Sequence, residues 1–307
     1  MPIQNMTQML KDARDGGYAV GAFNVVDYTS MRAVVDAAVE CTAPVIVQTS
    51  VKTVKLWGEA AMISWFRTIA ADAPVPVAIH LDHCRDVAFV GRCIDAGWTS
   101  VMFDGSQLPY DENLAATRSC VERAHAAGAS VEAELGRIVG VEDDIAVPGD
   151  EAHLADPDEA VAFCEGLGLD CFAPAIGTAH GVYKGEPRIA YDRLEEIATR
   201  TGLPLALHGG TGLSDEVFAK CIALGCAKVN ISTQLKHAFI DAFLEHTNTH
   251  TDEYNPLKQL AAQHERIAAE MGAKMELFGS AGRARARDGE AVGATGGAYP
   301  VRRTEGR

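Results

Sequence analysis

Residues 75–97 have the sequence VPVAIHLDHCRDVAFVGRCIDAG, and this stretch contains the pattern that decides the fold. It begins with the apolar run Val75–Leu81, which is typical of a buried parallel strand, and continues into a segment of helical character. That segment ends at Ala96-Gly97, where glycine suits the left-handed cap that closes a helix before the next strand. The stretch predicts one strand followed by one helix.

The same pairing of strand and helix recurs along the chain and gives eight units. Further helical segments end in glycine at Gly128, Gly168, Gly202 and Gly225. Eight alternating units favour a closed (β/α)8 TIM barrel, an α/β fold, over an open doubly wound sheet, and no G-x-G-x-x-G motif follows the first strand to indicate a dinucleotide fold. The predicted strands are Tyr18–Asn24, Pro44–Thr49, Val75–Leu81, Ser100–Phe103, Ser130–Glu134, Asp170–Ala175, Pro204–Leu207 and Lys228–Ile231.

Three segments lie outside this repeat of strands and helices. Gly136 to Pro157 is long, acidic and poor in periodicity, which is typical of an active-site lid rather than a linker. Asn255 to Phe278 has the pattern of an amphipathic helix, so residues 1–281 are predicted to form a single barrel domain with a C-terminal helical extension. Residues 282–307 are rich in Gly, Ala and Arg and are expected to form a mobile tail.

The composition indicates a globular protein that binds neither nucleic acid nor an acidic membrane surface. Of 307 residues, 48% are hydrophobic and 22% charged, and the formal net charge is −15. Phosphate backbones must be met by clustered Lys and Arg, which this acidic balance does not favour. No apolar run reaches about 18 residues, the first residues lack a signal-peptide pattern, and the eight cysteines include no C-x-x-C pair. We therefore expect reduced thiols and a cytoplasmic location.

Polar side chains follow the predicted strands at the end where barrel enzymes hold their catalytic groups. His83, His180 and His208 follow three different strands, and three neutral imidazoles with an open fourth position form a common catalytic zinc set. Each histidine alone is more often structural than a ligand, so the prediction depends on their joint placement. Asp82 adjoins His83 and places a carboxylate where a proton could be exchanged with substrate. His80 shares the strand face of Asp82 and is a candidate to support a ligand, while the other histidines are interpreted as structural or surface residues.

A glycine-rich turn, His208-Gly-Gly-Thr-Gly212, follows the seventh predicted strand. Barrels commonly hold a phosphate on backbone N–H groups in the loops after strands seven and eight, and glycine lets the backbone approach an anion closely. Polar residues follow the eighth strand as well, namely Asn230, Ser232 and Thr233. On its own the turn would be weak evidence, but beside a metal site it predicts a phosphate-binding position.

Seven short motifs follow one another on the expected strands. They are Gly21-Ala-Phe-Asn24, His80-Leu-Asp-His83, Val101-Met-Phe-Asp-Gly-Ser106, Glu132-Ala-Glu-Leu-Gly136, Gly177-Thr-Ala-His-Gly181, His208-Gly-Gly-Thr-Gly212 and Val229-Asn-Ile231. Together they make the chain similar to the class II ketose-bisphosphate aldolases, the family that contains the fructose-bisphosphate and tagatose-bisphosphate aldolases. The similarity runs from about Met6 to Ala284.

The resemblance implies reversible aldol cleavage of a ketose 1,6-bisphosphate, of the fructose or tagatose type, to dihydroxyacetone phosphate and an aldehyde such as glyceraldehyde 3-phosphate. It implies that His83, His180 and His208 bind Zn²⁺ or another divalent metal in its place, and that Asp82 exchanges a proton with the C4 hydroxyl. The physical chemistry agrees, because zinc on the ketose carbonyl would act as a Lewis acid and stabilise the enediolate left when the C3–C4 bond breaks.

The resemblance implies roles for further residues. Glu134 and Asp104 match positions beside the metal, where an alternative metal position is known, and Glu142 matches a lid carboxylate that handles the C1 proton. Some members need a monovalent cation, Na⁺ or K⁺, near the phosphate, and a homodimer or homotetramer that takes a small sugar phosphate is expected. Positions that contact substrate, chiefly its dihydroxyacetone phosphate half, are Asn24, Ser50, Gly181, Gly209, Gly210, Thr211, Asn230, Ser232 and Thr233.

Three positions depart from the family's pattern. Fructose-type members commonly have Asp, and tagatose-type members often Ala, where this chain has Ser232, so the C4 epimer stays open. Lys236 stands where many fructose-type members carry an Arg that reaches the distal phosphate, and Lys184, near His180, is a second candidate for that contact. Cys84 replaces the usual glycine after the ligand histidine, and it is expected either to pack or to be sensitive to oxidation.

Other functions agree less well with the residues. An imine mechanism needs a lysine inside the barrel, and the strand ends offer only Lys228, at the start of the eighth predicted strand. Metal-dependent hydrolases of the amidohydrolase type would have an H-x-H pair on the first strand, where this chain has Phe23-Asn24. A non-catalytic sugar-phosphate-binding barrel would be expected to lack a ligand or Asp82. A related metal-dependent lyase that acts on another phosphorylated sugar stays open.

Overall fold

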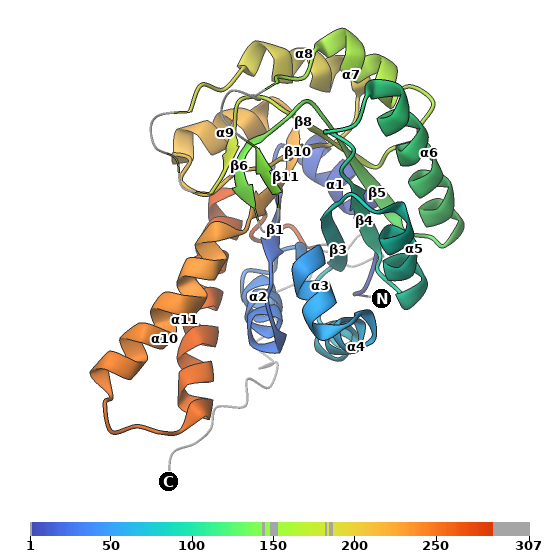
Figure 1. The fold of residues 1–307 in the computed structure, drawn as a ribbon. Helices are drawn as coiled ribbons and strands as arrows, with labels where there is room; N and C mark the ends of the chain where they lie inside the picture. The colour runs from blue at the N-terminus through green and yellow to red at the C-terminus, as the bar shows by residue number, and fades with distance from the viewer. Residues whose placement is uncertain (1, 143–144, 148–152, 182, 184–186, 285–307) are drawn as a thin grey trace.

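The computed structural model describes residues 2–142, 145–147, 153–181, 183 and 187–284, and it confirms the predicted closed barrel (Figure 1). Eight parallel strands close the barrel in the order β1-β11-β10-β8-β5-β4-β3-β2. Each corresponds to one predicted strand, with ends that differ by a few residues. Their bounds are β1 Val20–Asn24, β2 Val45–Ser50, β3 Val77–Cys84, β4 Ser100–Phe103, β5 Ser130–Leu135, β8 Cys171–Pro174, β10 Leu205–Leu207 and β11 Cys226–Ile231.

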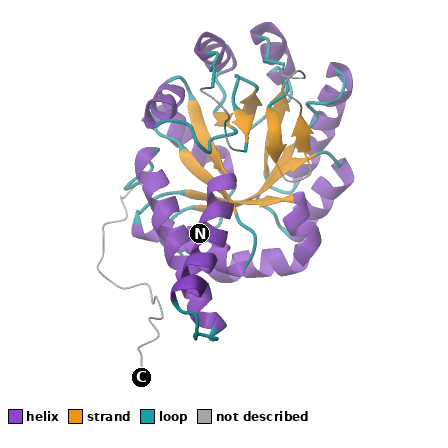
Figure 2. Ribbon diagram, turned by 60° about the vertical axis from the view of Figure 1, so that its left-hand side comes forward, coloured by secondary structure: helices purple, strands orange, loops and turns teal. Residues whose placement is uncertain are grey.

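Helices surround the barrel strands (Figure 2). Apolar side chains between strands and helices form the larger core, in which Phe66, Phe103 and Phe172 are fully buried. Because the strands are covered on both faces, their sequences are nearly continuous apolar runs. The helices are α1 Met6–Gly16, α2 Tyr28–Glu40, α3 Val51–Trp57, α4 Glu59–Ala70, α5 Val87–Ala96, α6 Tyr110–Ala126, α7 Pro157–Cys164, α8 Tyr191–Thr201, α9 Asp215–Ala223, α10 Thr233–Thr249 and α11 Pro256–Leu277.

The first helix, α1, is an element that the sequence analysis did not predict. Its residues Met6, Met9 and Leu10 pack with side chains of the barrel interior such as Ala22, and these form a second core. The N–H of Met6 donates to Ser130 Oγ at 3.0 Å, at the first residue of β5. This helix therefore closes the end of the barrel where the strands begin, so the opposite mouth lies at their C-terminal ends.

The segment predicted as a lid contains part of a small sheet. Strand β6 (Val139–Glu142) pairs antiparallel with β7 (Ile145–Val147) and parallel with β9 (Ala179–His180). Gly140 permits this contact, because its φ is +107° and a Cβ there would lie 2.2 Å from the backbone oxygen of His180. The segment therefore lies against the strand that carries one of the predicted ligands.

Helices α10 and α11 form a pair that extends away from the barrel (Figure 1). The predicted terminal helix Asn255–Phe278 is α11 with its two capping residues, and it packs against both α10 and α2. Beyond it, Gly282 N–H and Ala284 N–H donate at 2.9 Å to the carbonyl oxygens of residues 41–42. The predicted tail after Ala284 lies outside the described residues. Within the described ranges, every helix is too short or too polar to cross a membrane.

Candidate metal centre and active site

The three predicted histidine ligands meet at the mouth of the barrel. His83 lies near the end of β3, His180 ends β9 and His208 directly follows β10. All three are buried, and one ring nitrogen from each lies within 4.8 Å of the other two. Three imidazoles at this spacing can hold a transition-metal ion such as Zn²⁺.

A bulge in β3 lets two neighbouring residues, Asp82 and His83, contribute to the same site. Successive residues of a regular strand point to opposite faces, so both would not reach the mouth. Here the register against β4 shifts between Leu81 and Cys84, and His83 has a φ of +43°, in the left-handed region that side chains disfavour. Such a conformation costs about 1–3 kcal/mol and is typical of functional sites.

Carboxylate partners determine which imidazole nitrogens face the centre of the histidine cluster. His83 Nδ1 lies 3.1 Å from Asp104 Oδ2, and His208 Nε2 lies 2.7 Å from Glu132 Oε1. Since an ionised carboxylate can only accept a hydrogen bond, each of these two nitrogens carries a proton. His83 Nε2 and His208 Nδ1 then face each other at 2.8 Å. Two lone pairs at this distance repel unless a proton or a metal ion lies between them, so the two nitrogens are placed to face a cation.

Two buried carboxyl groups, Asp104 and Glu134, form a second candidate ligand group together with His83. Burial raises the pKa of Glu134 well above its ordinary value, and the nearby Asp104 carboxylate adds to this rise. Burial also acts to raise the pKa of Asp104, but the hydrogen bond and charge of His83 outweigh it and lower that pKa. Although desolvation lowers the pKa of His83, Asp82 and the other carboxylates raise it well above its ordinary value. The negative field of this site therefore favours a bound cation.

The carboxylate of Asp82 is held between two amide side chains. Asn24 Nδ2 donates to its Oδ2 at 2.8 Å, and Asn230 Nδ2 donates to its Oδ1 at 3.5 Å. Gln48 Nε2 donates to Asn24 Oδ1 at 2.7 Å, which fixes the direction of the Asn24 amide. Gln48 was not predicted to be part of the site, although it is a polar residue inside the buried strand β2. Strands β1, β2 and β11 thus orient one carboxylate beside the histidine cluster.

The glycine-rich turn after β10 is fixed against β9. The Tyr183 hydroxyl accepts from the N–H of Ala179 at 2.9 Å and donates to the carbonyl oxygen of Gly209 at 2.8 Å. Gly209 has a φ of +66°, and a Cβ there would lie 2.4 Å from the Ala179 oxygen, so the close approach requires glycine. After β11, Ser232 Oγ is buried and has no hydrogen-bond partner among the described residues. This hydroxyl is available to a ligand.

Other predicted substrate residues lie on segments that border the same mouth. Ser50 ends β2, Gly181 follows β9 and Thr233 begins α10. Lys236 is half-buried on α10, one turn after Ser232.

The turn after β10 also contains Gly210 and Thr211, and Thr211 Oγ1 accepts a hydrogen bond from the N–H of Gln234 in α10 at 3.3 Å. This bond ties the turn to the first residues of the helix that follows β11. Glu142 is the last residue of β6. Lys184 lies outside the described residues, so its predicted contact stays a prediction.

Two charged residues of the barrel interior were not predicted to take part in the site. Glu132 and Lys228 are both fully buried, and they form an ion pair of 2.9 Å. Strand β11 begins two residues earlier than predicted, so Lys228 lies inside it and not at its start. Burial acts to raise the pKa of Glu132, but Lys228 and the bond from His208 hold it well below its ordinary value. His80 Nε2 also lies 3.6 Å from this carboxylate. The available signal was the alternation of Glu132 with Glu134, which places both on the interior face.

The structure favours a packing role for the thiol of Cys84 over sensitivity to oxidation. It is buried and donates to the carbonyl oxygen of Asp86 at 3.4 Å. Burial raises its pKa to about 11, which leaves little reactive thiolate at neutral pH and favours the packing interpretation.

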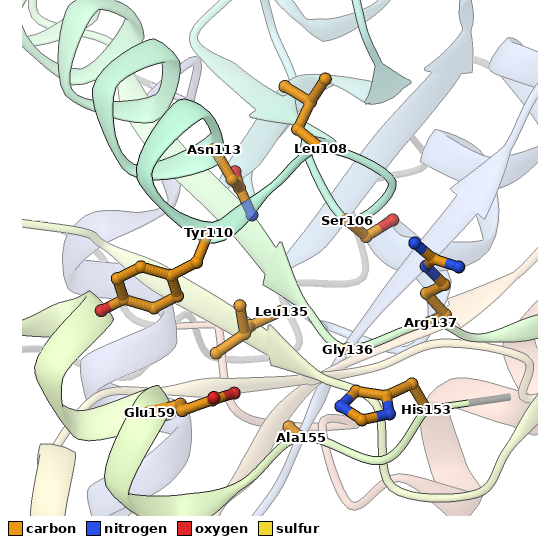
Figure 3. Close-up of a pocket in the computed structure, with 10 residues that line it drawn as sticks. All are labelled: Ser106, Leu108, Tyr110, Asn113, Leu135, Gly136, Arg137, His153, Ala155 and Glu159. Carbon is orange, nitrogen blue, oxygen red and sulfur yellow. The ribbon is translucent and has the colours of Figure 1, made fainter.

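A cavity of about 500 Å³ adjoins the carboxylate side of the site (Figure 3). Ser106 connects the two, because its hydroxyl donates to Asp104 Oδ1 at 2.6 Å. Apolar side chains form part of the wall, and no member of the histidine cluster lines it. The cavity therefore borders the site without containing it. Its lining residues are Ser106, Leu108, Tyr110, Asn113, Leu135, Gly136, Arg137, His153, Ala155 and Glu159.

Curated relatives share most of this chain. A probable fructose-bisphosphate aldolase of Bacillus subtilis is 42% identical over 293 residues, which cover 92% of this chain and all of the relative. A fructose-bisphosphate aldolase of Staphylococcus aureus is 41% identical over 294 residues, covering 93% of this chain and all of the relative.

Solved structures and a family profile agree with these relatives. The YdjI aldolase of Escherichia coli K12 superposes with a TM-score of 0.82 at 31% identity, over 92% of this chain and 100% of that one. A putative fructose-1,6-bisphosphate aldolase of Coccidioides immitis also gives 0.82, at 28% identity, over 90% of this chain and 96% of the other. The profile named fructose-bisphosphate aldolase class-II matches residues 4–283. The chain therefore belongs to the class II fructose-bisphosphate aldolase family, whose members are carbon–carbon lyases.

Proposed function

We propose that this aldolase reversibly cleaves a ketose 1,6-bisphosphate to dihydroxyacetone phosphate and an aldehyde, using a divalent metal held by His83, His180 and His208. The position of Asp82 carries the proposal. Its carboxylate is buried beside the histidine cluster and held by amides at 2.8 and 3.5 Å, which is how a group that moves a proton is oriented. The family is generally metal-dependent, which agrees with this ligand set.

In this mechanism different residues bind the metal, transfer the proton and bind the phosphate. When bound, the metal supplies a Lewis acid that stabilises the negative charge developing as the C3–C4 bond breaks. Asp82 accepts the proton of the C4 hydroxyl during cleavage and returns it during condensation. The amides of Asn24 and Asn230 orient its carboxylate. Backbone N–H groups of the turn at Gly209 and of the first residues of α10 bind the phosphate of the dihydroxyacetone half. Asp104 and Glu134 offer an alternative position for the metal.

Glu142 is proposed to move the proton at C1 of dihydroxyacetone phosphate. Replacing it with alanine should slow exchange of that proton with solvent deuterium by about 10²–10⁴-fold, as expected when a general base is lost. The exchange would be followed by NMR, with metal content measured in parallel and expected to be unchanged. Glu122→Ala, which removes an exposed carboxylate of α6, is the matched control. Exchange at the wild-type rate in Glu142→Ala would remove this residue from the mechanism.

The choice of ketose is proposed to depend on α10. Ser232 offers a buried hydroxyl without a partner among the described residues, and Lys236 follows one turn later. A lysine there would meet the distal phosphate as a point charge instead of as a bidentate fork. Since Ser232 is neither the fructose-type Asp nor the tagatose-type Ala, a related phosphorylated sugar is a second candidate substrate.

Product analysis tests both the reaction and this assignment. Metal-loaded enzyme would be incubated with dihydroxyacetone phosphate and a panel of aldehydes, and the stereochemistry of the products determined by NMR; we expect a ketose bisphosphate from glyceraldehyde 3-phosphate. Lys236→Ala should raise KM for the bisphosphate by about 10–100-fold, since a charge-assisted hydrogen bond contributes about 1.5–3 kcal/mol. Exchange at C1 of dihydroxyacetone phosphate should stay nearly intact, because only the distal anion loses its partner.

Two further variants serve as a control and as a test of epimer preference. Lys11→Ala removes an exposed lysine of α1, at the opposite end of the barrel, and should leave the kinetics unchanged. Ser232→Asp should shift preference toward the fructose-type epimer. Equal kinetics of wild type and Lys236→Ala on both fructose and tagatose bisphosphates would refute the contact to the distal phosphate. Absence of any condensation product would refute the proposed reaction.

We also propose that the native metal is Zn²⁺ and that the enzyme is a cytoplasmic homodimer or homotetramer. Imidazole ligands at a three-histidine site are typical of zinc, and the thiols of the described residues are unpaired. Large apolar side chains are exposed on the pair α10 and α11, including Ile240 at 53%, Leu244 at 49% and Leu257 at 70%. Large apolar side chains that stay exposed on one pair of helices are typical of a subunit contact.

A further inference from the structure

The proposed ligand His208 ends a buried chain of polar side chains that begins with Lys228 in the barrel interior. Lys228 Nζ lies 2.9 Å from Glu132 Oε2, and the other oxygen of that carboxylate lies 2.7 Å from His208 Nε2. The side chains of all three residues are fully buried. The salt bridge to lysine makes Glu132 a carboxylate, which can accept but not donate, so the proton of the imidazole lies on Nε2.

Lys228 has a second contact inside the barrel. Its Nζ donates to Asn230 Oδ1 at 2.7 Å. An amide whose oxygen faces an ammonium must turn its NH₂ group the opposite way, and Asn230 Nδ2 accordingly lies 3.5 Å from Asp82 Oδ1 and 3.3 Å from His208 Nδ1. One lysine therefore orients a ligand through Glu132 and a catalytic carboxylate through Asn230.

Stability of the barrel is a poor explanation for this ion pair. Removing two charges from water costs more than their attraction commonly returns, and well-packed apolar residues of similar volume are often as stabilising. The interior core of the barrel is otherwise built from apolar side chains, both small ones such as Ala173 and large ones such as Met102. A buried ion pair that contacts both His208 and the Asn230 amide points to a role in the site.

We propose that Glu132 and Lys228 are positioning residues. Glu132 holds the proton of His208 on Nε2 and so makes Nδ1 the metal-binding atom, while Lys228 anchors Glu132 and sets the direction of the Asn230 amide. This inference rests on the proposed role of His208 as a ligand. Partners that orient a ligand typically contribute a factor of about 10–100 in metal affinity.

The double variant Glu132→Gln, Lys228→Met tests the inference, because it removes both charges together. Either single change would leave a buried charge without its partner and destabilise the fold. We expect the double variant to fold and to bind Co²⁺ about 10–100-fold more weakly than wild type, in competition with a chelating dye. The absorption bands of bound Co²⁺ should also change, because the imidazole no longer holds one orientation.

A direct readout uses the wild-type protein loaded with Zn²⁺ and labelled with ¹⁵N. NMR should find the His208 proton on Nε2, with Nδ1 bound to the metal. The matched control is Asp170→Asn, which disrupts another carboxylate–imidazole pair, His125 Nε2 with Asp170 Oδ2 at 2.9 Å, and should leave Co²⁺ affinity unchanged.

The positioning role and the ligand assignment are contradicted by different results. If the double variant binds Co²⁺ with wild-type affinity and spectrum, or if the His208 proton lies on Nδ1, the positioning role is wrong even though His208 is a ligand. If His208→Ala also keeps wild-type affinity, the ligand assignment itself fails, and the inference fails with it.

Discussion

Replacing His208 with alanine should remove both the bound metal and the aldol reaction. One of three imidazoles is lost, and the remaining pair, His83 and His180, leaves a cluster too open to hold Zn²⁺ against a chelator. Because a catalytic metal contributes several kcal/mol to stabilising the transition state, turnover should fall by at least about 10³-fold. Metal content would be measured by atomic emission after dialysis, and cleavage of the ketose bisphosphate by a coupled assay.

The wild-type enzyme supplies the companion experiment. Chelation should abolish its activity, and Zn²⁺ or Co²⁺ should restore it. His125→Ala is the control, since this imidazole pairs with Asp170 away from the histidine cluster and should lose neither metal nor turnover. Full activity in excess chelator, with the metal shown to be absent, would contradict the metal mechanism. Retention of metal and turnover in His208→Ala would show that the ligand set is wrong.

The barrel and the approximate place of the site were predictable because both follow from local patterns. Apolar runs with glycine-terminated helices between them indicate parallel strands, and barrel topology then brings every strand end to one mouth. His83 and His208 are 125 residues apart, yet each could be assigned to that mouth from its own strand alone.

What could not be predicted depends on contacts between distant segments. The bulge that gives His83 its positive φ is a register shift between β3 and β4. No residue of the apolar run Val75–Leu81 indicates this shift. The pairing of β6 with β9 involves residues 139–140 and 179–180, too few to produce a strand pattern. The sequence pattern predicts Lys228 as the first residue of the eighth strand. Its true position is inside β11, where the partner Glu132 makes burial tolerable.

Asp82→Ala should separate proton transfer from metal binding, and its effect on cleavage should be on the order of 10²-fold or more. The variant loses the carboxylate that receives the C4 proton but retains all three imidazoles, so Zn²⁺ content should equal that of wild type. The amides of Asn24 and Asn230 lose an acceptor, but both lie at the mouth, where substrate hydroxyl groups and water can replace it.

The decisive comparison is between two reactions of the same variant. Exchange of the C1 proton of dihydroxyacetone phosphate does not involve the C4 hydroxyl, so Asp82→Ala should exchange nearly as fast as wild type while cleaving slowly. Glu142→Ala should have slow exchange with its metal intact. Asp95→Ala, which removes a carboxylate that pairs with Arg123 on the protein surface, should leave both reactions unchanged. Equal loss of cleavage and exchange in Asp82→Ala would mean that this carboxylate organises the whole site and does not serve the C4 proton alone. Cleavage near the wild-type rate would exclude it as the acid–base group, because nothing else in the variant would have replaced a carboxylate at that position.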